Sequence, residues 1–192
     1  MAMPVIPESR RYSVAEVLDF PPDGNRYEVV AGELLVTPAP TAGHQLLVSR
    51  LMTLLSDYLK PLGRRDSLYS SPADITWGQS PKDAEDLVQP DIFVVVATQV
   101  TSWRDVTRLA LAIEVLSPWN TRAERVVKRG TYQRHGVETY WVVDGAAQLV
   151  EVWRPADDRP EIMIQELVWK LSDESPELRI PLADLFAPPG SR

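Results

Sequence analysis

The chain contains no cysteine, which excludes disulfide bonds and metal sites built from thiolates. It also lacks any apolar run near the ~18 residues that a membrane-spanning helix needs. The first residues, MAMPVIPESRRYSVAE, do not contain the apolar centre of a signal peptide. We therefore expect a cytoplasmic protein that neither enters nor crosses a membrane.

The chain has fewer basic than acidic residues. The chain has 20 lysines and arginines against 27 aspartates and glutamates, and its net charge is −7. A general nucleic-acid binder usually carries a basic surplus, so the balance argues against that class. The charge is uneven, however, because Arg104 to Arg134 holds seven basic residues against three acidic ones, whereas Glu151 to Arg179 holds four against eight. A basic face on an acidic body is consistent with this pattern.

The length of 192 residues is typical of one globular domain, and we expect a single domain over residues 1–192 with its core at about 25–155. The predicted order is helix, strand, strand, strand, helix, strand, with a hairpin in front and further strands behind. The apolar runs 91–96 and 109–116 lack alternation, which is typical of strands buried on both faces. The pattern predicts an α/β fold with a mixed central sheet flanked by helices.

Individual elements have recognisable ends. Ala31-Gly32 predicts the turn of the N-terminal hairpin, and Thr41 caps a helix that runs to about Lys60. Residues 162–170 are predicted to be one strand that completes the sheet. Residues 177–186 are expected to form a strand or a short helix that covers an edge.

One carboxylate lies inside the most apolar run of the chain. Glu114 interrupts LALAIEVL, and an ionised carboxylate buried there costs several kcal/mol unless another group compensates it. A second carboxylate, Asp91, opens the run DIFVVV directly after Pro90. A cation, either a metal ion or a lysine, is the natural compensator for both.

The helix predicted after Glu114 carries candidate partners. Glu124, Lys128 and Tyr132 are spaced by four residues and therefore share one face. The helix follows the Glu114 strand through a short turn, so it packs back near the end of that strand and Lys128 can reach the carboxylates. An adjacent basic stripe on the same helix consists of Arg122, Arg125 and Arg129.

Such a group supports metal-assisted hydrolysis of a phosphodiester. Asp91 and Glu114 supply the hard oxygen ligands that Mg²⁺ prefers, together with waters and phosphate oxygens. The metal ion lowers the pKa of a bound water and stabilises the charge of the transition state. Lys128 would orient the water, assist its deprotonation or hold the phosphate.

Simpler structural interpretations remain open at this point. Asp91 can be a turn residue at the start of a strand. Glu114 can form a buried ion pair with Lys128 or with an arginine, and Glu124 and Lys128 can be a solvated pair one helical turn apart.

Two further residues, His44 and Glu28, have both a structural and a functional interpretation. His44 lies on the same stripe as Leu47 and Leu51, where a hydrogen-bonded core histidine is more usual than a metal ligand. Glu28, in the predicted hairpin, can reach the same pocket as a further carboxylate.

Taken together, the motifs form a known pattern. They are YEVVAGEL, then His44, VQPDIFVVV, AIEVLSP, Lys128-x-x-x-Tyr132 and HGVETYWVVD. This pattern resembles the Uma-type restriction endonuclease family of the PD-(D/E)XK nuclease superfamily, over about Tyr12 to Phe186. The resemblance implies a restriction-endonuclease-like core in which Pro90-Asp91 is the PD element and Glu114 the acidic member of (D/E)XK.

The sequence departs from the superfamily pattern at two places. Leu116 stands where the superfamily usually has its lysine, and the resemblance implies that Lys128 on the following helix takes that part. Glu124 stands where members commonly have an aspartate, four residues before this lysine.

The resemblance also implies roles. Asp91, Glu114 and Lys128 are the expected catalytic residues, and Asp91 and Glu114 the expected ligands of Mg²⁺ or Mn²⁺. The expected supporting residues are Glu28, His44, Glu124 and Tyr132. The residues expected to bind nucleic acid are Arg122, Arg125 and Arg129.

We therefore expect a metal-dependent endonuclease that hydrolyses DNA and acts as a homodimer. One alternative is a catalytically silent protein of the same fold that acts by binding. Another is a metal-dependent hydrolase of a different phosphoester.

Overall fold

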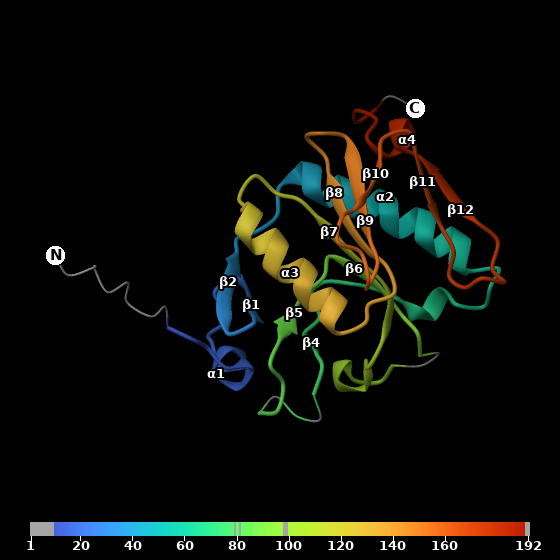
Figure 1. Cartoon of the computed structure of the whole chain (residues 1–192). Helices are drawn as coiled ribbons and strands as arrows, with labels where there is room; N and C mark the ends of the chain where they lie inside the picture. Colours follow the sequence, from blue (N-terminus) through green and yellow to red (C-terminus); the bar gives the residue numbers. More distant parts are fainter. Residues whose placement is uncertain (1–9, 79, 81, 98–99, 191–192) are drawn as a thin grey trace.

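A six-stranded mixed sheet forms the centre of the protein (Figure 1). The structure is a computed structural model that describes residues 10–78, 80, 82–97 and 100–190. The first nine residues, on which the signal-peptide expectation partly rests, lie outside the described part. The strand order is β10-β9-β8-β7-β6-β3; β7 and β8 pair in parallel, and the other neighbouring strands in this order pair antiparallel. The strands are β3 (Leu68–Ser70), β6 (Ile92–Val95), β7 (Leu109–Val115), β8 (Tyr140–Asp144), β9 (Leu149–Trp153) and β10 (Glu161–Met163).

The two apolar runs of the sequence are central strands. Every residue of β6 and β7 is buried, which confirms the prediction from their missing alternation. Successive side chains face opposite sides of the sheet, so Ile92 and Val94 enter one core while Phe93 and Val95 enter another. The mixed α/β fold is therefore confirmed.

One long helix covers the first face of the sheet. It is α2 (Ala42–Leu59), which begins at the Thr41 cap as predicted and buries Leu47, Leu51 and Leu55 against the strands. Within the described ranges, no helix combines the length and apolarity needed to cross a membrane.

The second face is covered by a helix and a small sheet. The helix is α3 (Arg122–Arg134), and Figure 1 shows strands of the central sheet between it and α2. Its capping box joins Thr121 and Glu124. The small sheet has the order β2-β1-β5-β4 and packs with the short helix α1 (Val14–Leu18). Its strands are β1 (Arg26–Val30), β2 (Glu33–Thr37), β4 (Ile75–Thr76) and β5 (Leu87–Val88).

The predicted hairpin turn is present between β1 and β2. Ala31 and Gly32 both have positive φ angles, 51° and 79°, as a two-residue type I′ turn requires. Gly32 adopts this geometry without steric cost, and the carbonyl of Ala31 accepts a hydrogen bond from Arg11.

The C-terminal region differs from the prediction. Residues 162–170 do not form one strand, because β10 ends at Met163 and β11 (Glu166–Trp169) joins a separate two-stranded sheet with β12 (Leu178–Pro181). Leu167 and Trp169 alternate inward and join the core beneath α2. β12 and the helix α4 (Leu182–Leu185) pack on α2. Residues 177–186 therefore contain both predicted elements, a strand in the first half and a short helix in the second.

A buried aspartate ties the small sheet to the end of α3. Asp86 Oδ1 accepts from the backbone N–H of Ala31, and Oδ2 accepts from Arg134 and His135 at 2.9 and 2.7 Å. The His135 ring also stacks on Trp77, with 4.1 Å between ring centroids. Burial alone raises the pKa of Asp86, but these hydrogen bonds outweigh it and lower the pKa to about 2.

The Asp86 contacts predict a pH-dependent contribution to stability. A lowered pKa means that the contribution is complete above the ordinary value of 3.8 and is lost as the pH falls toward about 2. We expect Asp86→Asn to lower the free energy of unfolding by about 2 kcal/mol at neutral pH. The difference from the parent should shrink between pH 4 and pH 2 in urea titrations.

The exposed neighbour Glu85 provides the control. Glu85→Gln should change the unfolding free energy by less than about 0.5 kcal/mol. A difference between parent and Asp86→Asn that stays constant down to pH 2 would contradict this account of Asp86.

Candidate active site

The two predicted carboxylates lie opposite each other on adjacent strands. Ile92 of β6 pairs with Ile113 of β7, and continuing this antiparallel register places Asp91 opposite Glu114. Directly opposed residues have Cβ atoms about 4.5–5.5 Å apart on the same face of a sheet. The pair lies on the α3 face, where β7 ends and β6 begins.

Asp91 is held by three donors. Its Oδ1 accepts from Arg26 Nη1 at 2.7 Å, and its Oδ2 accepts from His44 Nε2 at 3.0 Å and from the Val115 N–H at 2.9 Å. Burial alone raises the pKa of Asp91, but the His44 hydrogen bond and the Arg26 charge outweigh it and hold the pKa below its usual value. The carboxylate is therefore ionised, and it is not a simple turn residue.

Glu114 shares a lysine with a second glutamate. Lys128 Nζ lies 2.6 Å from Glu114 Oε1 and 3.0 Å from Glu28 Oε2. The Tyr132 hydroxyl donates to Glu114 Oε1 at 2.7 Å, and Glu28 Oε1 accepts from the Gln89 N–H. All four side chains of this cluster, Glu28, Glu114, Lys128 and Tyr132, are buried.

The pKa values of Glu114 and Lys128 in this cluster are both raised. Burial raises the pKa of Glu114 to about 7, against the lowering effect of Lys128 and with support from the charges of Glu28 and Asp91. Burial by itself would lower the pKa of Lys128, but Glu114 and Glu28 outweigh it and raise that pKa. Lys128 is thus a stable cation at neutral pH, shared by two buried carboxylates.

Most of the predicted site residues meet here. Glu28 and His44 were each assigned two interpretations from the sequence; Glu28 is a member of the cluster, and His44 contacts the neighbouring Asp91. Glu124 has other contacts: its carboxylate accepts from the Thr121 N–H at 2.8 Å and closes the capping box of α3. The interpretation of Glu124 and Lys128 as a solvated pair is therefore wrong, because Glu124 caps the helix while Lys128 is buried against Glu28 and Glu114. A supporting role for Glu124 stays a prediction.

Arg26 was missed from the sequence. It lies two residues before Glu28 on β1, and a strand places such residues on the same face. Alternation in RYEVV was therefore the available signal, but only the tertiary fold shows that this face meets Asp91.

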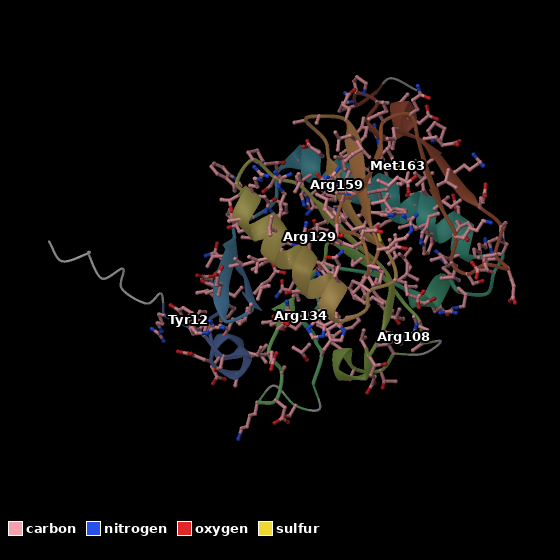
Figure 2. All side chains as sticks on the ribbon, viewed as in Figure 1. Tyr12, Arg108, Arg129, Arg134, Arg159 and Met163 are labelled. Atoms are coloured by element: carbon pink, nitrogen blue, oxygen red, sulfur yellow. The ribbon has the colours of Figure 1, made fainter. Side chains whose placement is uncertain are left out.

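The predicted basic stripe lies away from the carboxylates. Figure 2 labels Arg129 on the middle of α3, and its guanidinium lies 4.6 Å from the centroid of the Trp153 ring. A groove of about 260 Å³, here called the arginine groove, runs beside this stripe. It is lined by Arg122, Arg125, Val126, Arg129, Val142, Glu151, Trp153 and Pro160.

A small hollow opens beside Glu114 and is here called the site hollow. Its free volume is about 10 Å³, which is room for about one water or small ion. Arg26, His44 and Lys128 line it, whereas Asp91 lies behind Arg26 and His44. Other lining residues include Pro38, Glu114, Ser117, Trp119 and Asn120.

The carboxylate oxygens of Asp91 and Glu114 suit a hard divalent ion, but they already form ion pairs with Arg26 and Lys128. Asp91 uses three of its roughly four lone-pair sites, and Glu114 Oε2 has no hydrogen-bond partner among the described residues. Across residues 10–78, 80, 82–97 and 100–190, no cluster of three or more acidic or histidine side chains converges as a ready metal site. Asp91 and Glu114 would hold an ion together only if Arg26 moved away from Asp91.

Comparison with known proteins places this chain in a family. The sequence profile of Uma2, described as "Putative restriction endonuclease", matches residues 14–183. The chain belongs to the Uma2 family. The description indicates a nuclease related to restriction endonucleases, as the motifs around Asp91 and Glu114 predicted. No curated protein matches the chain.

A solved structure has the same fold. It is the crystal structure of a putative nuclease belonging to DUF820 from Anabaena variabilis, with a TM-score of 0.71 and 21% sequence identity. The match covers 91% of this Uma2 chain and 97% of the other. At this identity the likeness confirms the fold alone.

The shared lysine predicts strong coupling in stability. Lys128→Met leaves two buried carboxylates without their cation and should cost about 3–5 kcal/mol of unfolding free energy at neutral pH. The double variant Lys128→Met/Glu114→Gln should be more stable than Lys128→Met, because one uncompensated charge is gone. Urea unfolding measures both.

Lys170→Met is the matched control, because Lys170 pairs with Glu177 at the surface. It should cost less than about 1 kcal/mol. Equal midpoints for Lys128→Met and Lys170→Met would contradict the buried network.

Proposed function

We propose that this Uma2 protein is a divalent-metal-dependent endonuclease that hydrolyses DNA phosphodiester bonds. The observation that carries the proposal is the cross-strand pair Asp91 and Glu114 with the Lys128 ammonium 2.6 Å from Glu114. The family description, "Putative restriction endonuclease", supports the reaction class. Mg²⁺ or Mn²⁺ as the ion and a cytoplasmic homodimer as the acting form belong to the proposal.

Each side chain has a definite part in this proposal. Asp91 and Glu114 would hold the ion, which when bound lowers the pKa of water and polarises the phosphate. Because its pKa is raised, Lys128 acts as a cation that holds the scissile phosphate and orients the water, rather than as a base. His44 positions Asp91, and Tyr132 positions Glu114.

Arg26 would control access to the metal site. Its guanidinium occupies the Oδ1 side of Asp91 and adds a positive charge beside Glu114 and Glu28. An ion that binds Asp91 must displace this contact. Arg26 then becomes free to contact the substrate phosphate.

The test is cleavage of supercoiled plasmid together with calorimetric titration of Mn²⁺. Asp91→Asn and Glu114→Gln should abolish both cleavage and Mn²⁺ binding. Arg26→Met should strengthen Mn²⁺ binding by about tenfold, since a competing charge is removed. The exposed Glu33→Gln should match the parent in both measurements.

Cleavage by Asp91→Asn or Glu114→Gln at the parent rate would overturn the assignment. Weaker Mn²⁺ binding by Arg26→Met would show instead that Arg26 supports the site rather than closing it.

The arginine groove is the proposed path of the DNA backbone. None of Arg122, Arg125 and Arg129 forms an ion pair with the residues that the structure describes. If Arg129 contacts a phosphate, Arg129→Gln should reduce the slope of log affinity against log salt by about one. Arg159→Gln, outside the groove lining, should leave the slope unchanged in filter-binding titrations. Equal slopes for Arg129→Gln and the parent would remove Arg129 from the DNA path.

A second candidate function is binding without catalysis. The observation that favours it is that, among the described residues, Arg26 and Lys128 already form ion pairs with Asp91, Glu28 and Glu114. The Mn²⁺ titration separates the two functions, because a silent protein should bind the ion no tighter than millimolar and should not respond to Asp91→Asn.

A further inference from the structure

A larger pocket adjoins the proposed active site. Its volume is about 600 Å³, within the range of small-ligand sites, and here it is called the adjacent pocket. It lies at the carboxyl ends of β7 and β8, the parallel pair of the central sheet, where α/β proteins commonly bind ligands. Its walls are mostly apolar, with polar groups at a few points. The lining includes Leu47, Leu116, Phe186, His44, Asn120 and Arg125.

The adjacent pocket is continuous with the two regions already described. It shares His44, Ser117 and Asn120 with the site hollow, and it shares Arg125 with the arginine groove. A ligand in the pocket would therefore lie between the proposed metal ligands and the proposed DNA path.

Two buried nitrogen atoms at this junction, His44 Nδ1 and Arg125 Nε, have no hydrogen-bond partner among the described residues. His44 is 6% exposed, and its Nδ1 forms no hydrogen bond with the described residues. Because Nε2 donates to Asp91, Nδ1 is left as an acceptor. Arg125 Nε is also buried and has no partner in the described part of the chain. Asn120 Oδ1 accepts two hydrogen bonds from Ser117, which leaves the Asn120 amide N–H groups as donors.

The charge of the pocket favours an anionic ligand. Arg50 and Arg125 line it against one acid, Asp144, whose Oδ1 already accepts from the Ala146 and Ala147 N–H groups. The N-terminal turn of α2 adds the positive end of the helix dipole through Gly43, beside which a Cβ would meet no atom within 4 Å. An apolar peptide would leave these charges unmatched.

We propose that the adjacent pocket binds the base of the nucleotide next to the scissile phosphate. This inference rests on the proposed function and names the form of its substrate. The apolar walls match the faces of a base, while the amide N–H groups of Asn120 match acceptor atoms on its edge. A base seated there has left the helical stack, so the protein binds a single-stranded or extruded nucleotide.

The turn between β8 and β9 offers a matched pair of variants. Ala146 and Ala147 are both exposed, but only Ala146 lines the pocket. Ala146→Trp fills the pocket without touching the carboxylates, and Ala147→Trp adds the same side chain outside it.

The experiment is fluorescence anisotropy of the full chain without divalent ions, using one labelled DNA as a single strand and as a duplex. The parent should bind the single strand more tightly than the duplex. Ala146→Trp should weaken single-strand binding by about tenfold or more, and Ala147→Trp by less than about twofold. The nucleotide dAMP should displace the strand from the parent better than inorganic phosphate does.

Three results would overturn the proposal: tighter duplex binding, equal effects of the two tryptophan variants, or displacement by phosphate as effective as by dAMP. Failure of the proposed function is distinguishable. In that case Asp91→Asn and the parent would be equally inactive on plasmid while the metal-free binding results above still stood.

Discussion

One buried ammonium joins the parts of this structure. Lys128 of α3 lies between Glu28 of β1 and Glu114 of β7, and so connects the helix, the small sheet and the central sheet. Lys128 lies beside Glu114 because an ionised carboxylate buried in the run Leu109–Val115 needs a positive charge in direct contact. Burial raises the pKa of Glu114 to about 7, above its usual range, and the charges of Glu28 and Asp91 add to this effect while Lys128 opposes it. The cluster is therefore both a structural tie and a site that attracts further positive charge.

The neighbouring carboxylate is compensated differently. Asp91 receives Arg26 from β1 and His44 from α2, so its pKa is lowered while that of Glu114 is raised. Opposed on adjacent strands, the two acids thus differ in proton affinity. In the proposed nuclease, Asp91 and Glu114 would hold a metal ion in place of the Arg26 contact, and Arg26, Lys128 and the arginine groove would contact the phosphates. The adjacent pocket is proposed to bind the base of the nucleotide next to the scissile phosphate.

The sequence predicted the features that depend on local chemistry. The unbroken apolar runs predicted central strands, Thr41 predicted the start of α2, and the short turn after the Glu114 strand predicted that Lys128 reaches Glu114. The features that depend on tertiary packing could not be predicted. The break after β10 arises because Leu167 and Trp169 pack beneath α2. Arg26 meets Asp91 only because β1 crosses the strand ends, and a local capping box takes Glu124 away from the cluster.

The most direct measurement is anomalous difference density from crystals of the parent protein soaked in Mn²⁺, compared with crystals grown without divalent ions. The account predicts a peak in coordination with both Asp91 and Glu114, Arg26 withdrawn from Asp91, and Lys128 still paired with Glu28. Crystals that show no peak at millimolar Mn²⁺, with Arg26 still on Asp91, would contradict it.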